Sequence, residues 1–145
     1  MPNRTYALEW LNIANRNLET ARLLLRENHF NDSIAIEIQQ TIEKSFKAVY
    51  AYFGISIPRT HSLTVLFNIV NEKIPLDEIE IDDIITISDY YETDRYPGPK
   101  YFVPSREEVD HYFLFAEQLF KRIDEFINSW IFNNNNLSLN SILIG

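Results

Sequence analysis

Glutamine and charged side chains recur every three or four residues between Gln39 and Ala48. A helix places residues at this spacing on one face, here beside an apolar stripe. Such a face could bind a nucleotide or a partner protein. The alternative is a solvent-exposed face on which a carboxylate and an ammonium group four residues apart form an ordinary ion pair. The polar residues concerned are Gln40, Glu43, Lys44 and Lys47.

A cation and an aromatic ring are neighbours in a second segment, residues 94–104. This segment holds three prolines and a glycine, which predicts a loop. Arg95 and Tyr96 on this proline-stiffened loop could contact the phosphate and the base of a nucleotide, by charge and by stacking. Alternatively, Arg95 pairs with Glu43 or Asp94 and fixes the loop against the rest of the domain.

The three histidines do not indicate metal or cofactor chemistry. His61 follows Thr60 at the start of a predicted helix, where a hydrogen-bonding or structural role is expected. His29 lies in a polar turn, where simple exposure is expected. No two histidines have the spacing of metal ligands, and the sequence contains neither cysteine nor a glycine-rich phosphate loop. We therefore predict no metal and no cofactor.

The acidic composition restricts the ligands that the protein could bind. The 145 residues carry a formal net charge of -8, with a pI of about 4.8. This charge opposes a large nonspecific contact with nucleic acid, so any RNA binding must be local. A hydrophobic content of 46% is sufficient for the core of one domain. Because no segment is typical of a signal peptide or a membrane span, we expect a cytoplasmic protein that is not bound to a membrane.

Two long helices are predicted to position the polar residues described first. Apolar residues recur every three or four positions from Tyr6 to Asn28 and again from Ser33 to Phe53. Asp32 is the expected N-cap of the second helix, and Gly54 stands where a glycine commonly ends a helix. Because the link between the helices is short, they should pack as an antiparallel hairpin.

Two shorter helical segments follow the hairpin. The first covers residues 63–71 and could be capped by Thr60 or Ser62. The second covers residues 76–92, where many isoleucines also permit a strand. Acidic residues concentrated at the start of this segment suit the dipole of a helix, so we predict a helix there.

The last predicted helix is rich in aromatic residues. It begins at the capping-box sequence that runs from Ser105 to Glu108, and it continues to Trp130. The pattern as a whole predicts an all-α fold, an antiparallel bundle of about five helices. We assign residues 1–132 to the bundle and residues 133–145 to an asparagine-rich C-terminal tail. The aromatic residues exceed what one face of a small bundle hides, which predicts a homodimer: Tyr112, Phe113, Phe120, Phe126 and Trp130.

Several short motifs occur in an order that resembles one protein family. Gln-Gln-x-x-Glu-Lys-x-x-Lys-Ala fills the second helix, after a first helix that contains Trp10. A Thr-His-x-Leu step begins at Thr60, and an Arg-Tyr-Pro step begins at Arg95. Over about residues 7–130 the sequence resembles the HEPN family, the helical domains found beside nucleotidyltransferases in prokaryotic toxin–antitoxin pairs.

The resemblance implies a fold, a partner and an activity. Family members form bundles of about five helices with an up-down four-helix core, and they tend to be homodimers. Many are encoded beside a minimal nucleotidyltransferase that is their partner. Many are also metal-independent ribonucleases, which carry an Arg-x(4 to 6)-His motif near the start of the last long helix. Arg106 and His111 have this spacing at this position, although Arg22 and His29 have it too.

The chemistry of Arg106 and His111 fits RNA cleavage, but their surroundings do not. An imidazole could take the proton of a ribose 2′-hydroxyl while a guanidinium holds the phosphate. An ideal helix separates residues five apart by about 140°, so convergence needs a frayed turn or a second subunit. Nearby Glu107, Glu108 and Asp110 would repel a phosphate.

Two hypotheses follow from these observations. One is a HEPN protein that binds a nucleotide or a nucleotidyltransferase partner in a toxin–antitoxin-type system, and the acidic charge favours it. The other is a metal-independent endoribonuclease toxin that uses Arg106 and His111. The residues predicted to bind the nucleotide or partner are Gln40, Glu43, Lys44, Lys47, His61, Arg95 and Tyr96.

Overall fold

The fold is an all-α bundle, as predicted. The computed structural model describes residues 3–93, 97–98 and 101–144, and within them it contains helices but no strand. Arg95 and Tyr96 lie outside the described residues. The segment of residues 76–92 is helical, as expected, but its helix is divided in two at Asp89. The helices are α1 (Arg4–Arg26), α2 (Asn31–Tyr52), α3 (Leu63–Lys73), α4 (Glu78–Ser88), α5 (Tyr90–Thr93) and α6 (Arg106–Ile144).

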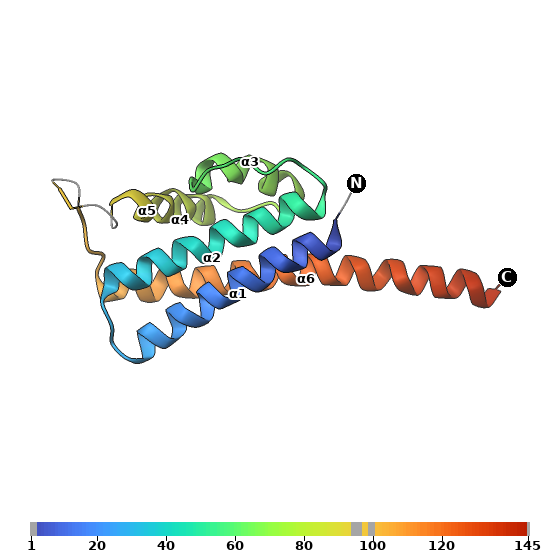
Figure 1. Ribbon diagram of the computed structural model, residues 1–145, viewed down its shortest axis with the longest axis horizontal. Coiled ribbons are helices and arrows are strands. Elements are labelled where there is room, and N and C mark those ends of the chain that lie inside the picture. The colour runs from blue at the N-terminus through green and yellow to red at the C-terminus, as the bar shows by residue number, and fades with distance from the viewer. Residues whose placement is uncertain (1–2, 94–96, 99–100, 145) are drawn as a thin grey trace.

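The long helices α1, α2 and α6 lie side by side, and α3, α4 and α5 cover α2 on another side (Figure 1). α1 and α2 form the predicted antiparallel hairpin. Asn28 in their link has a positive φ of 53°, which reverses the chain sharply. After α3, helices α4 and α5 lead the chain back to the end of the bundle where α6 begins (Figure 1). The up-down order expected for the bundle is therefore present.

The helix ends follow local capping rules, with one exception. The side chain of Ser62 caps α3, Asp77 and Glu80 form a full capping box on α4, and Ser105 accepts a hydrogen bond from the Glu108 N–H at the start of α6. The exception is α2, which begins one residue before the predicted N-cap. Asp32 lies in its first turn and accepts a hydrogen bond from the Ser33 N–H.

Helix α2 is the centre of the core. Helices α1, α3, α4, α5 and α6 all pack against it. From Thr41 to Tyr52 every residue of α2 is buried except Lys44, which is half-buried. An ordinary amphipathic helix buries one face, whereas this half of α2 is buried on nearly all sides. Any polar group on it must therefore find its partner inside the protein.

The end of α6 extends past the bundle. The helix continues through residues 133–144 to Ile144, although the sequence changes composition at residue 133 (Figure 1). The boundary between a bundle of residues 1–132 and a tail thus remains a prediction. Of the helices in the described ranges, none has both the length and the apolar character needed to cross a bilayer.

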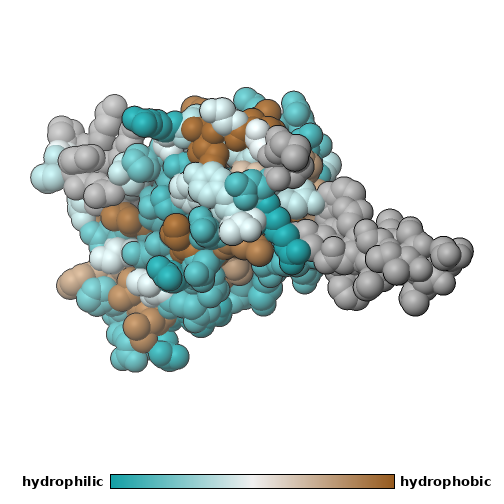
Figure 2. Space-filling model, turned by 45° about the vertical axis from the view of Figure 1, so that its right-hand side comes forward, coloured by the Kyte–Doolittle hydropathy of each residue, from teal (hydrophilic) through white to brown (hydrophobic). Residues whose placement is uncertain are grey.

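Most aromatic residues expected at a dimer interface pack within the chain. Phe113 is buried, and Tyr112, Phe120 and Phe126 pack against the core, while the Trp130 side chain lies outside the description. Large hydrophobic residues are exposed elsewhere, and on the face in Figure 2 such residues form separate patches within a mostly hydrophilic surface.

The homodimer stays a prediction. Light scattering at micromolar concentration should give twice the chain mass of 17.2 kDa. The exposed hydrophobic residues would supply the buried apolar area that a stable pair needs. A mass of one chain across the accessible concentration range would contradict the dimer.

Candidate functional site

A fully buried carboxylate lies at the centre of the polar residues on α2. The Glu43 side chain has no exposed surface, and its Oε2 atom lies 2.6 Å from Lys44 Nζ and 3.1 Å from Lys47 Nζ. The ammonium groups are themselves shielded, with 17% and 9% of the two side chains exposed. Glu43 and Lys47 do form the ion pair that their spacing permits, but it lies inside the protein and not on a solvent-exposed face. Arg95, the alternative partner of Glu43, lies outside the described residues.

Two further side chains form hydrogen bonds with the other oxygen of this carboxylate. Glu43 Oε1 lies 3.0 Å from His61 Nδ1 and 3.4 Å from Gln39 Nε2. Gln39 Nε2 also donates to the His61 carbonyl at 2.7 Å, and Gln40 donates to Gln39 Oε1 at 2.6 Å. Gln39 therefore ties the loop before α3 to α2. The structure brings together the predicted residues Gln40, Glu43, Lys44, Lys47 and His61 in one network.

The electrostatics keep Glu43 ionised. Burial by itself would raise the pKa of this carboxyl. The hydrogen bond and charge of Lys44, the charge of Lys47 and the hydrogen bond from His61 outweigh burial and hold the pKa below its ordinary value of 4.5. One carboxylate and two ammonium groups leave the network with one positive charge, in a chain whose net charge is -8.

Trp10 of α1 covers the lysine side of the network. The Nζ atoms of Lys44 and Lys47 lie 5.9 and 5.6 Å from the centre of its ring, in the range of a cation–π contact. Among the described residues, none accepts a hydrogen bond from the buried Trp10 Nε1 atom. The indole ring therefore contacts the network through its π face.

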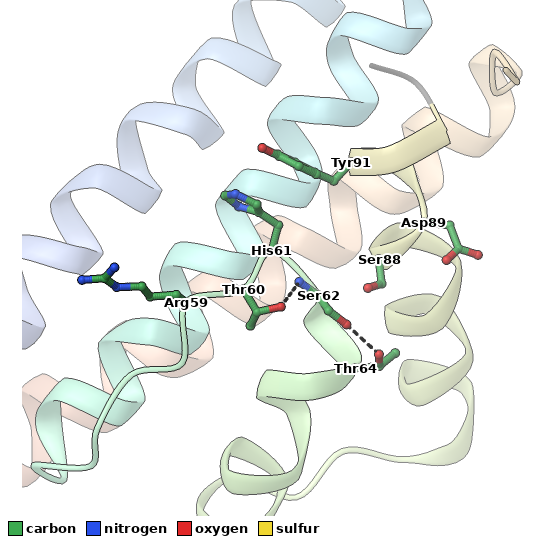
Figure 3. Close-up of a pocket in the computed structure, with 8 residues that line it drawn as sticks. All are labelled: Arg59, Thr60, His61, Ser62, Thr64, Ser88, Asp89 and Tyr91. Carbon is green, nitrogen blue, oxygen red and sulfur yellow. Dashed lines mark hydrogen bonds between the residues drawn. The ribbon is translucent and has the colours of Figure 1, made fainter. Parts of the chain in front are cut away.

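A cavity opens on the histidine side of the network. It has a volume of about 370 Å³ and is lined by Arg59, Thr60, His61, Ser62, Thr64, Ser88, Asp89 and Tyr91. The rings of His61 and Tyr91 stack with centroids 4.0 Å apart and planes 18° from parallel. Figure 3 shows this stack beside the hydroxyl-bearing residues, with the Arg59 side chain extending away from Ser88 and Asp89. Half of the His61 side chain, 51%, is exposed.

The two residues of the predicted ribonuclease motif have different partners. Arg106 Nη2 donates to the His29 carbonyl at 3.4 Å, at the α1–α2 link, and its buried Nη1 atom has no hydrogen-bond partner among the described residues. His111 Nε2 lies 3.3 Å from Asp83 Oδ2 on α4, and 59% of the His111 side chain is exposed. The described contacts therefore tie Arg106 and His111 to different parts of the bundle. Arg22, of the competing match, pairs with Glu117 at 2.6 Å.

His111 lies where two cavities meet. One, of about 390 Å³, is lined by Ser105, Glu107, Glu108, His111 and Tyr112. The other, of about 430 Å³, lies between α4 and α6 and contains Arg122. No group of three or more potential metal ligands occurs among the described residues.

Comparison with known proteins decides the family. The model of the HEPN domain matches residues 7–126 of this sequence. The chain belongs to the HEPN domain family. A relative named Putative toxin MJ1304, from Methanocaldococcus jannaschii, is 30% identical over 140 residues, which cover 86% of this chain and 90% of that protein.

Two solved structures share the HEPN fold of this chain. The crystal structure of TT1696 from Thermus thermophilus has a TM-score of 0.71 at 23% identity and covers 82% of this chain and 96% of that one. The crystal structure of ST0689, an archaeal HEPN homologue, has a TM-score of 0.66 at 21% identity. The match covers 83% of this chain and 97% of that one.

Sequence reasoning did not select three residues that the structure places at these sites. Gln39 adjoins the predicted residue Gln40, so only its burial distinguishes it. Tyr91 falls inside the helix predicted for residues 76–92, and nothing in that pattern indicates its contact with His61. Asp83 was expected only as part of an acidic helix start, and its contact with His111 joins residues 28 positions apart.

Proposed function

We propose that this HEPN protein is the toxin-like component of a toxin–antitoxin-type system and that the cavity at His61 and Tyr91 binds a nucleotide. The observation that carries the proposal is the half-exposed His61–Tyr91 stack, which a hydrogen bond to the buried Glu43 holds in place. Proteins commonly bind nucleobases by stacking them on an aromatic side chain, and the His61–Tyr91 pair offers such a surface beside a cavity.

The charges and hydroxyls around the cavity suit the other parts of a nucleotide. The cavity lining holds one cation, Arg59, and one carboxylate, Asp89, and the Glu43 network beside it adds one surplus positive charge. An anionic phosphate is therefore favoured near Arg59 in this acidic protein. Ser62, Thr64 and Ser88 can exchange hydrogen bonds with a ribose. Asp89 can accept hydrogen bonds from the ribose hydroxyls.

The toxin–antitoxin assignment rests on the relatives. The name of the M. jannaschii protein describes a toxin, and this chain spans most of that protein. The family resemblance adds a nucleotidyltransferase as the expected partner protein. A nucleotide-binding site on the HEPN protein would let the two proteins engage the same ligand.

Substitution of the stacked tyrosine tests the nucleotide site. Tyr91→Ala should weaken the binding of ATP or AMP, measured by isothermal titration calorimetry, by roughly 5- to 150-fold, because stacking on one aromatic side chain contributes about 1–3 kcal/mol. Phe102→Ala is the matched control, since Phe102 is exposed and lies outside the cavity. Equal affinities of the wild type and Tyr91→Ala would reject the site.

A second candidate function is RNA cleavage, favoured by the exposed His111 and the carboxylate that orients it. Unprotonated His111 would take the proton of a 2′-hydroxyl, whose oxygen then attacks the phosphorus and expels the 5′-oxygen. The departing oxygen takes up a proton from water, so the products are a 2′,3′-cyclic phosphate and a 5′-hydroxyl. Arg122 in the same cavity, or Arg106, would stabilise the charge on the phosphate. Asp83 and the neighbouring carboxylates oppose the approach of RNA.

Cleavage of single-stranded RNA in the presence of a chelator tests this second function. His111→Ala should abolish cleavage, and the exposed His111 should be replaceable without loss of the fold. His29→Ala is the control and should retain full activity. Cleavage that survives in His111→Ala would exclude His111 as the base, and an inactive wild type would leave nucleotide binding as the function.

A further inference from the structure

The groove between α4 and α6 combines apolar residues with two ion pairs. Its volume is about 430 Å³, and Ile79, Leu114 and Phe115 supply its apolar lining. Arg122 also lines it, and its Nη2 lies 2.8 Å from Glu80 Oε2. His111 of α6 pairs with Asp83 of α4 in the same lining. These contacts hold α4 against α6 and leave a trough between them.

Large apolar side chains at this groove are exposed. Ile79 is 72% exposed and Leu114 is 54% exposed, and Ile85 on the same helix α4 is 49% exposed. Ile79 lies on α4 and Leu114 on α6, the two helices that line the groove. Single exposed apolar residues are ordinary, but exposed apolar residues from both helices in the lining of one groove mark a surface for another molecule.

The rim of the groove is acidic. Residues 77–83 include five carboxylates and no Lys or Arg. Two of these carboxylates are engaged by Arg122 and His111, and Asp77, Glu78 and Asp82 are exposed. At the start of α6, Glu107 and Glu108 line the adjoining cavity, which shares His111 with the groove. The field around the apolar lining is therefore negative.

We propose that the α4–α6 groove binds a basic amphipathic helix of a partner protein. Leucine-like side chains of that helix would fill the trough between Ile79 and Leu114, and its Lys or Arg residues would face the exposed carboxylates. The phosphates of a nucleic acid would be repelled by these carboxylates. A second copy in a symmetric contact would place the same acidic rim against itself. Charge complementarity therefore selects a cationic protein segment.

This interaction surface is separate from the nucleotide cavity and does not depend on it. The groove contains none of the residues that line the cavity at His61 and Tyr91. A helix in the groove would cover His111, so partner binding would exclude RNA from that side chain. The carboxylates around His111, which would repel RNA, would attract the basic residues of the partner helix.

A labelled synthetic helix tests the proposal with the full chain. The probe is a fluorescein-labelled peptide of about 20 residues with leucines on one face and lysines on the other, and binding is measured by fluorescence anisotropy. We expect saturable binding that weakens with salt, because the rim contributes through screened charges. A scrambled peptide of the same composition has no apolar face and should bind at least tenfold more weakly.

Two matched variants locate the binding surface. Leu114→Ser should weaken the binding of the peptide at least tenfold. Val65→Ser changes a similarly exposed residue on α3 and should leave the affinity for the peptide unchanged. Thermal unfolding by circular dichroism checks that both variants are folded. Equal binding of the scrambled peptide, or unchanged affinity in Leu114→Ser, would overturn the proposal. Conversion of a dimer to a monomer by Leu114→Ser would assign the groove to a second copy and would also overturn it.

Discussion

Glu43→Gln should lower the free energy of unfolding by about 3–5 kcal/mol, because it removes one partner of a buried ionic network. The carboxylate has no exposed surface, and it pairs with both Lys44 and Lys47, whose side chains are only 17% and 9% exposed. A glutamine has nearly the same shape but no charge, so the two ammonium groups would remain close together inside the protein. The loss should exceed that of any surface substitution.

Urea unfolding at neutral pH, followed by circular dichroism, measures this effect. Glu9→Gln is the matched control, since Glu9 is exposed on α1, and it should change the free energy of unfolding by less than about 0.5 kcal/mol. A loss below about 1 kcal/mol in Glu43→Gln would mean that the lysines find other partners or reach water. The network would then not be a stabilising centre of the fold.

The same carboxylate predicts a dependence of stability on pH. The pKa of Glu43 in the folded state lies below its ordinary value of 4.5, so the folded state favours the ionised form. This contribution is fully present above pH 4.5 and is lost as the pH falls through the lower pKa of the folded state. Wild type should therefore lose more stability than Glu43→Gln when urea unfolding is repeated at successively lower pH. Parallel curves for the two proteins would contradict the prediction.

Phe46→Ala should also cost about 3–5 kcal/mol, through the cavity that it leaves. Phe46 is the largest fully buried side chain on α2, and it lies one turn from Glu43 in the half of the helix that is buried on nearly all sides. Phe30→Ala provides the comparison, because Phe30 is 69% exposed and its loss should change stability by less than about 0.5 kcal/mol. If both variants lose a similarly small free energy of unfolding, the core around α2 must collapse into the cavity that Phe46→Ala leaves.

The sequence by itself determined the helices and most of their ends. The apolar repeat predicts α1 and α2 closely, and Ser62, Gly54 and Ser105 mark ends where the structure has them. These features depend on residues within a few positions of each other, so the local sequence is sufficient. The N-terminus of α2 was placed wrongly because Asp32 resembles a cap but lies inside the first turn.

Only the tertiary structure decided how the polar residues are used. The spacing of Glu43 and Lys47 permitted a solvent-exposed ion pair, and periodicity does not show that five helices surround α2 and bury both residues. The partners of these and other polar groups come from distant positions: His61 meets Glu43 and Tyr91, and His111 meets Asp83 instead of Arg106. Such contacts depend on how helices pack across the bundle, whereas sequence patterns report only which side of each helix is apolar.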